Sequence, residues 1–158
     1  MGSPATIIPM LLLPLTIIVG GLAVWLGRTA ERMAGAALLS TLVLQVLVMA
    51  VVGPQLGMSR NTLGAILDVA ISLTLGLVFL WAALKHNSRW LGFAFFVQGV
   101  ELTISAYFLG PDVPLKPATY FKLLNVMTFL TVTLLAIATA QAFLRRRRES
   151  RASESQLE

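Results

Sequence analysis

Two carboxyl side chains lie within long apolar stretches of this chain and are the first candidates for chemistry. Asp68 lies in the stretch TLGAILDVAISLTLGLVFLWAALK, and Glu101 lies in the next apolar stretch. An ionisable side chain inside a membrane is costly and needs a partner, so such residues often bind protons, ions or each other. The same two acids can also act as neutral hydrogen-bonding groups that hold helices together.

Other polar side chains fall at a similar depth in their helices. With a helical rise of about 1.5 Å per residue, Asp68, Lys122 and Asn125 lie about 6–10 Å from the outer ends of their helices. Gln45 and Glu101 lie about 16–18 Å from the inner ends, in a membrane core about 30 Å thick. The predicted intramembrane polar layer consists of Gln45, Asp68, Gln98, Glu101, Lys122 and Asn125.

The spacing of polar residues within each helix indicates faces that point into a bundle. Gln98, Glu101 and Ser105 are spaced i, i+3 and i+7, which places them on one helical face. Asp68 and Ser72 are four residues apart and share a face in the same way. We therefore expect these two polar faces to meet inside the protein.

Lys122 is the basic residue of this layer. Its ammonium group can neutralise one carboxyl group and leave the other protonated or free to bind a cation. Alternatively, Lys122 extends its ammonium group to the membrane surface, as long basic side chains do. The sequence leaves both alternatives open. Tyr107 and Tyr120 can line a pocket in this layer, but anchoring at the membrane interface explains both more simply.

The composition identifies the class of protein. Of the 158 residues, 57% are hydrophobic and 12% are charged, whereas soluble domains are about 45–50% apolar. Five apolar runs reach the length of about 20 residues that a membrane-spanning helix needs. The predicted all-α integral membrane protein has spans at 7–27, 33–53, 62–85, 90–109 and 118–144. Residues 1–144 thus form a five-helix transmembrane bundle, and we expect 145–158 to be a basic, disordered cytoplasmic tail.

Basic residues are distributed unevenly along the chain. Nine of the 12 Lys and Arg fall on one side of the membrane if the first turn, the third turn and the tail share that side. The positive-inside rule then predicts an outside N-terminus and a cytoplasmic C-terminus. We interpret the arginine run as a topology anchor and predict no nucleic-acid partner; the anchor residues are Arg145, Arg146, Arg147 and Arg148.

Three further charged residues fall on the same side. Glu31 and Arg32 follow the first apolar run, and Arg89 precedes the fourth. We predict that Glu31 pairs with Arg89 across the cytoplasmic face, close to Arg32. An exposed ion pair contributes only about 0–1 kcal/mol, so no function is assigned to this pair.

The sequence carries no signature of catalysis or of a cofactor. It has no cysteine, and its one histidine, His86, lies in a short polar turn. HExxH, GxSxG and glycine-rich phosphate motifs are missing. We therefore predict no catalytic residue, no metal site and no cofactor, and we do not expect an enzyme.

Three stretches, GRTAERMAGAALL, LDVAISLTLGLVFLWAALKHNSRW and FFVQGVELT, lie between residues 27 and 103. They resemble small, uncharacterised multi-pass inner-membrane proteins of alphaproteobacteria. The features that carry the resemblance are a Glu-Arg pair after the first helix, an Asp in the third and an Arg-aromatic start to the fourth: Glu31, Arg32, Asp68, Arg89 and Trp90. The resemblance implies a bacterial inner (plasma) membrane location and no particular activity.

Three functions fit these features. Small size and few polar groups favour a non-enzymatic accessory or scaffold subunit that contacts the lipid bilayer and other membrane protein subunits, or a homo-oligomer. An alternative is a small proton- or cation-coupled transporter or channel that uses Asp68 and Glu101; a second is a lipid- or pigment-binding protein with a lateral groove lined by Phe93, Phe96 and Tyr107. A water-accessible cavity at the two carboxyl groups would favour transport, whereas sealed and paired acids would favour a packing role.

Overall fold

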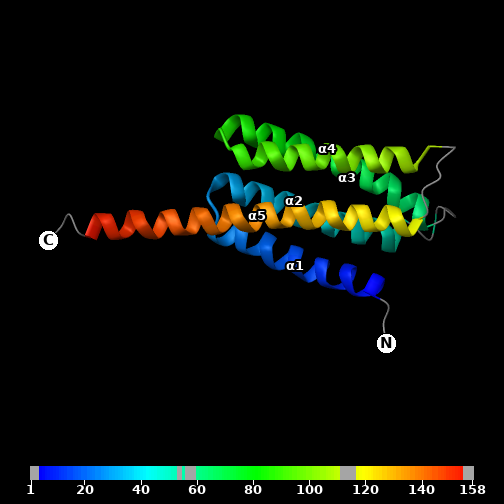
Figure 1. Ribbon diagram of the computed structural model, residues 1–158, viewed down its shortest axis with the longest axis horizontal. Coiled ribbons are helices and arrows are strands. Elements are labelled where there is room, and N and C mark those ends of the chain that lie inside the picture. The colour runs from blue at the N-terminus through cyan, green and yellow to red at the C-terminus, as the bar shows by residue number, and fades with distance from the viewer. Residues whose placement is uncertain (1–3, 53–54, 56–59, 111–116, 155–158) are drawn as a thin grey trace.

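The computed structural model describes residues 4–52, 55, 60–110 and 117–154, and the side-chain surroundings of 11–52, 55, 62–110 and 118–149. The described residues form five α-helices, which confirms the predicted all-α architecture. Successive helices run in opposite directions along the bundle (Figure 1). The helices are α1 (Pro4–Leu26), α2 (Thr29–Val51), α3 (Arg60–His86), α4 (Arg89–Phe108) and α5 (Pro117–Glu154).

Four of the five helices have the length and composition of membrane spans. Among the described residues, four helices contain a long apolar span: Thr29–Val51, Thr62–His86, Arg89–Phe108 and Ala118–Glu149. The part of α1 whose side chains are described, Leu11–Leu26, is also apolar but is shorter than these four spans. Large apolar side chains cover the outside of the bundle, including Trp25, Leu84 and Phe96, each at least 70% exposed. Soluble proteins rarely expose so much apolar surface to water. The protein is therefore a multi-pass membrane helical protein that contacts lipid.

The two turns at one end of the bundle are shorter than predicted. The predicted turn at 28–32 belongs mostly to α2, which begins at Thr29. A Cβ atom at Gly27 would lie 2.3 Å from the Ala23 carbonyl oxygen, so the chain needs glycine at this turn. Between α3 and α4, Asn87 has a φ of 48°, in the left-handed region that asparagine enters more readily than most residues.

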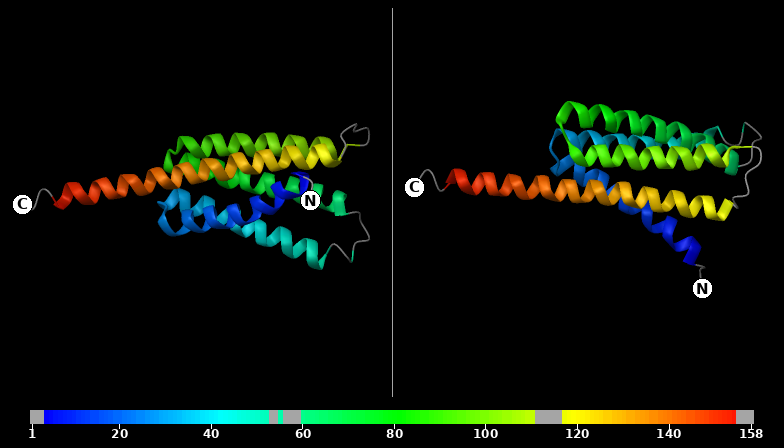
Figure 2. Two further views of the ribbon diagram at one scale, coloured as in Figure 1. Left: turned by 60° about the horizontal axis from the view of Figure 1, so that its bottom comes forward. Right: turned by 45° about the horizontal axis from the view of Figure 1, so that its top comes forward.

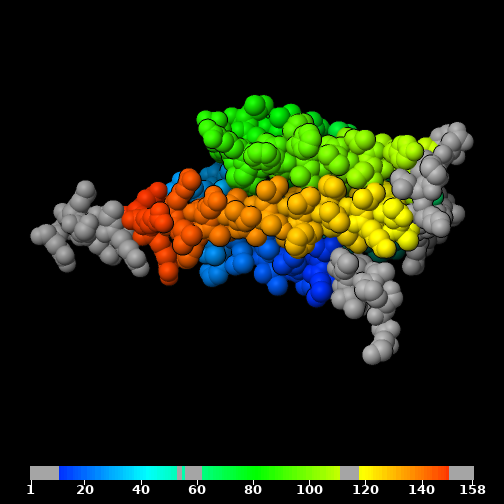
Figure 3. Space-filling model, in the orientation of Figure 1, coloured from blue at the N-terminus to red at the C-terminus, as the bar shows by residue number. Residues whose placement is uncertain are grey.

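The five helices form a closed ring in chain order. Each helix packs against the next one along the chain, α5 packs against α1, and α2 also contacts α5. The left view of Figure 2 shows α4 on one side of α5 and the pair α1 and α2 on the other. Figure 3 shows α5 filling the space between α4 and α1 on one face.

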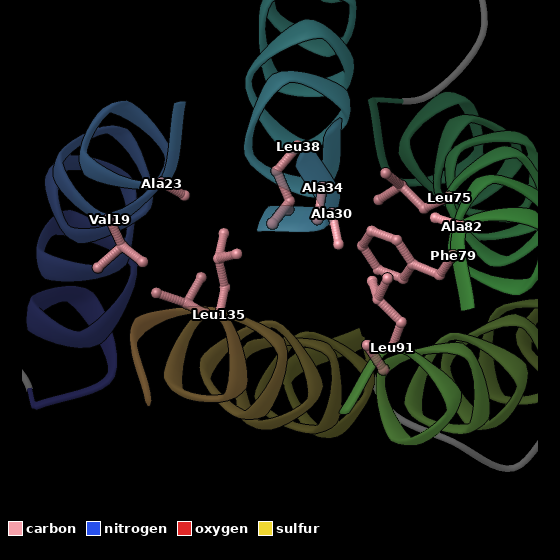
Figure 4. Packing of buried hydrophobic residues seen from close by; sticks show 12 residues of the cluster. Val19, Ala23, Ala30, Ala34, Leu38, Leu75, Phe79, Ala82, Leu91 and Leu135 are labelled. Atoms are coloured by element: carbon pink, nitrogen blue, oxygen red, sulfur yellow. The ribbon is translucent and has the colours of Figure 1, made fainter. Parts of the chain in front are cut away.

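Apolar side chains from all five helices meet at the centre of this ring, as Figure 4 shows. They include Val19 of α1 and Ala34 of α2, and every buried member of the cluster is at most 9% exposed. We refer to the bulkier members around the centre as the apolar layer: Leu38, Leu75, Phe79, Leu91, Val132 and Leu135. Because these side chains fill the ring, they form a barrier across it.

The turns after α1 and α3 and the arginines of α5 lie at the same end of the bundle, which we call the basic end (Figure 1). Here α5 continues through 145–148 to Glu154, in place of the disordered segment predicted from residue 145; residues 155–158 lie outside the described residues. The segment is rich in Arg, Glu and Ala, which are good helix formers. Arg28 forms an ion pair with Glu149, at 2.8 Å between Nη2 and Oε1. Both side chains are exposed, so the pair contributes about 0–1 kcal/mol.

Candidate functional site

A polar cavity of about 240 Å³ lies inside the ring, on the side of the apolar layer away from the basic end. A single buried water needs only about 10–15 Å³ of such space, so the cavity can hold several. Its polar lining comprises two acids, three amides and four threonines: Asp68, Glu101, Gln45, Gln98, Asn125, Thr16, Thr41, Thr128 and Thr131. Among the described residues, no lysine, arginine or histidine lines the cavity.

Asp68 of α3 accepts hydrogen bonds from two other helices. Gln45 of α2 donates from Nε2 to Oδ1 at 3.1 Å. The Tyr120 hydroxyl group of α5 donates to Oδ2 at 2.9 Å. These two bonds link α2, α3 and α5 at one point. Because both donors are neutral, they leave an ionised Asp68 without a countercharge.

Glu101 of α4 accepts a hydrogen bond from a residue of its own helix, and that donor residue also contacts α5. Gln98, one turn earlier, donates from Nε2 to Glu101 Oε2 at 3.0 Å. The same amide nitrogen lies 3.3 Å from Thr131 Oγ1 of α5, and Thr131 in turn donates to the Met127 carbonyl oxygen at 3.2 Å. Glu101 is thus oriented toward the cavity by neutral groups alone.

Two buried polar atoms beside Glu101 have no hydrogen-bond partner in the part of the chain that the structure describes. They are the Gln98 side-chain oxygen and the Ser72 hydroxyl oxygen. Of the two residues only Gln98 lines the cavity. Because buried polar groups in folded proteins are almost always paired, its side-chain oxygen marks a place where water or a ligand can bind.

Lys122 does not join this group. Its side chain is exposed, and in the described chain it forms no ion pair with Asp68 or Glu101. The hypothesis that Lys122 neutralises one of the acids is therefore wrong. The structure brings the other five predicted layer residues around the cavity, while the functional role of this layer stays a prediction.

The interpretation of Tyr120 as an interface anchor is wrong. Its side chain is 0% exposed and stacks on Phe108, with 4.2 Å between ring centroids. The Ser105 hydroxyl group lies 3.3 Å from the Tyr120 hydroxyl oxygen and can donate to it. Tyr120 therefore belongs to the polar network of the cavity. In the sequence, the only indication that Tyr120 joins the network is its position, one turn into a helix. An interface anchor has the same position, so the sequence does not distinguish the two roles.

The apolar layer closes the cavity toward the basic end. Leu38 of α2 and Leu75 of α3 line the cavity and also belong to the buried core. Phe79 and Leu91 lie beyond them, and each is at most 1% exposed. Figure 4 shows these side chains pointing toward one another across the ring. The two acids are thus separated from the basic end by packed hydrocarbon.

The bond from Tyr120 to Asp68 can be tested with a double-mutant cycle. Tyr120→Phe keeps the ring on Phe108 and removes the donor, so its effect should depend on whether residue 68 is Asp or Ala, which has no side-chain acceptor. We expect a coupling of about 0.5–3 kcal/mol in the unfolding free energy measured in detergent. Tyr107→Phe is the matched control, because Tyr107 is 56% exposed, and it should show no coupling. Additive effects at Tyr120 would contradict the hydrogen bond.

The predicted pairing of Glu31 with Arg89 does not occur. In the described chain neither residue forms an ion pair, although both lie at the basic end. Arg32 donates instead from Nε to the Gly27 carbonyl oxygen at 2.9 Å, which satisfies a backbone group at the end of α1. Glu31 lies in the first turn of α2, where its carboxyl group is buried. The predicted anchor residues Arg145, Arg146, Arg147 and Arg148 are exposed on α5.

Comparisons with known proteins leave the site to be interpreted from its own geometry. No protein-family model matches the chain, and no curated protein or solved structure is significantly similar to it.

Proposed function

We propose that this protein is a small proton- or cation-coupled membrane transporter and that the polar cavity is its binding site. The observation that carries the proposal is the presence of two carboxyl groups, Asp68 and Glu101, on one cavity without a basic residue among its described lining. An ionised carboxylate inside a membrane needs a countercharge. A bound cation supplies that charge, and a bound proton removes the need for it.

The donors around the acids suit a weakly held ligand. The described residues contain no group of three or more His, Asp or Glu side chains that could hold a metal ion. Two carboxyl groups with amide and hydroxyl oxygens fit a proton, a partly hydrated monovalent cation or a small amine. Transport requires such intermediate affinity, because the ligand must leave the site as well as enter it.

The apolar layer supports a transporter over an open channel. Leu38 and Leu75 separate the cavity from the basic end by buried hydrocarbon, and an ion cannot cross such a layer at rest. Access from that side requires the helices to move apart, as alternating access does. We further propose that the basic end faces the cytoplasm of a bacterial cell, in line with the positive-inside rule.

The proposal predicts that two conservative substitutions stop transport. Asp68→Asn combined with Glu101→Gln keeps the side-chain shapes and removes both negative charges, so we expect the flux into liposomes to fall at least about tenfold. The measurement uses the purified full chain, an internal pH-sensitive dye for protons, and gradients of sodium, potassium or methylammonium ions.

Two threonines provide matched controls for this experiment. Thr74 of α3 and Thr103 of α4 are exposed, and each donates to a carbonyl oxygen of its own helix at 2.8 Å. Thr74→Val and Thr103→Val should therefore keep the flux of the unmodified protein. Absence of flux with the unmodified protein, or equal flux in the double variant, would contradict the proposal. It would favour the accessory-subunit hypothesis, which predicts stoichiometric co-purification with a larger membrane complex.

The lipid- or pigment-binding hypothesis depends on the face formed by three aromatic residues. Phe93 is 66% exposed, Phe96 is 70% exposed and Tyr107 is 56% exposed. Such exposure is what side chains in contact with bulk lipid have. The cavity with its two acids is therefore the stronger basis for a function.

A further inference from the structure

A second, larger cavity lies at the basic end, outside the apolar layer. This cleft has a volume of about 780 Å³ and is formed by the α1–α2 turn, the α3–α4 turn and one face of α5. It shares no lining residue with the polar cavity of the proposed transport site. It is therefore a separate candidate for ligand binding.

Two helices begin at this cleft without a capping side chain. Arg28 precedes α2 and Ser88 precedes α4, and neither makes a side-chain hydrogen bond to the first turn. The first N–H groups of a helix have no partner within the helix and carry partial positive charge. Residues of both first turns line the cleft, among them Ala30 and Trp90. Two helix N-termini thus favour an anion at the same place.

The side chains of the cleft supply further donors. Arg28, Arg89 and Arg145 line it, and within the described residues Arg28 alone of these pairs with an acid, Glu149. The indole Nε1 of Trp90 and the imidazole Nε2 of His86 are buried without a hydrogen-bond partner in the described part of the chain. An indole N–H group can only donate. These groups together match an oxygen-rich anion such as a phosphate group.

One carboxyl group is buried among these donors. Glu31 is 8% exposed and lines the cleft, and its Oε2 atom has no hydrogen-bond partner within the described residues. A simple inorganic anion would leave this carboxylate unpaired and would be repelled by it. The ligand must therefore carry a hydrogen-bond donor, preferably positively charged, beside its phosphate group.

We propose that this cleft binds a phosphate ester of a primary amine. The phosphate group binds at the N-termini of α2 and α4, where Arg89, Arg145 and Trp90 donate to it. The ammonium group binds to Glu31. This chemistry occurs both in the headgroup of an aminophospholipid and in a soluble aminoalkyl phosphate, and it is independent of the proposed transport function.

Soluble probes test the two halves of the recognition separately. Binding of O-phosphorylethanolamine and of inorganic phosphate is measured by calorimetry on the delipidated full chain in detergent. We expect phosphorylethanolamine to bind at least about tenfold more tightly, because it alone pairs with Glu31. Glu31→Gln should remove this preference, and Arg89→Gln should weaken both probes by a similar factor.

A matched control and a second arm distinguish the sources of the ligand. Lys85→Gln removes a charge at the same end but outside the cleft, where Lys85 lies over the Trp81 ring at 4.6 Å, so it should bind like the unmodified protein. Native mass spectrometry then compares protein reconstituted with phosphatidylethanolamine or phosphatidylcholine. One phosphatidylethanolamine retained per chain, and lost in Glu31→Gln and Arg89→Gln, would identify a lipid headgroup as the ligand.

Binding of phosphorylethanolamine without retained lipid would identify a soluble ester instead. If neither probe nor lipid distinguishes Glu31→Gln and Arg89→Gln from Lys85→Gln, the proposal is wrong. Because Asp68 and Glu101 are absent from this cleft, their substitution should leave the binding of both probes unchanged. Failure of this proposal is thereby distinguishable from failure of the proposed transport function.

Discussion

Phe79→Ala is expected to lower the free energy of unfolding by about 3–5 kcal/mol, the range found for truncating a buried Phe. Phe79 is 1% exposed and lies at the centre of the ring, near Leu75 and Leu91 (Figure 4). In a membrane the hydrophobic effect does not hold helices together, so tight packing of this kind provides much of the attraction. The truncation removes that packing and leaves a void in the apolar layer.

Unfolding in detergent, followed by loss of helical signal with temperature or denaturant, measures this effect. Leu77→Ala is the matched control on the same helix, because Leu77 is 58% exposed and faces outward. It should lower the free energy of unfolding by well below 1 kcal/mol. A second readout is leakage of protons through liposomes, which should rise in Phe79→Ala because the barrier between cavity and basic end is thinned. Equal stability losses for the two variants would contradict the central position of Phe79.

Gly35→Val is expected to separate α1 from α2 and to cost at least about 1–3 kcal/mol, the usual range for overpacking. A Cβ atom at Gly35 would lie 2.8 Å from the Gly20 carbonyl oxygen and 2.9 Å from the Ala23 Cβ atom. Neither obstacle is the flexible end of a side chain, so the helices themselves must shift. Close helix approach at small residues is a common basis of association in membranes.

Gly21→Val provides the control, because no atom lies within 4 Å of the position of a Cβ at Gly21. Both substitutions replace a helical glycine with the same β-branched residue, so differences in helix propensity nearly cancel. Thermal unfolding in detergent should show Gly35→Val melting at a clearly lower temperature than Gly21→Val. Equal melting temperatures would show that α1 and α2 are not in the close contact described above.

The sequence predicted the number and order of the helices because each apolar run is interrupted by charged or turn-forming residues. It predicted boundaries less well where the helix extends into charged sequence. Thr29 to Arg32 are good enough helix formers to start α2 early, and the arginine-rich segment after residue 144 extends α5 to Glu154. In both places the charged residues indicate that the membrane span ends there, but a helix can continue beyond the end of its membrane span.

The polar layer was partly predictable because depth can be counted along a helix. Gln45, Asp68 and Glu101 indeed line one cavity. Rotation about the helix axis is harder to predict when nearly all neighbours are apolar, since the usual alternation of polar and apolar faces is weak. Spacing alone therefore does not reveal that Lys122 faces outward and that Tyr120 faces inward.

The cleft at the basic end could not be predicted from the charges alone. Glu31 and Arg89 suggested an ion pair because both flank turns on one side of the membrane. The early start of α2 instead buries the Glu31 carboxyl group, while Arg89 stays exposed at the start of α4. A shift of a few residues in one helix start thus decides whether an acid pairs with its neighbour or faces a cleft.

The length of α5 has a practical consequence for imaging the protein. Its 38 residues extend about 57 Å, nearly twice the ~30 Å thickness of a membrane core. The ten residues from Arg145 to Glu154 therefore reach about 15 Å beyond the last apolar turn. A helical reporter domain joined in register after Glu154 would inherit the orientation of the bundle. A 17.1 kDa protein that a detergent micelle would otherwise hide gains a rigid marker for electron cryomicroscopy.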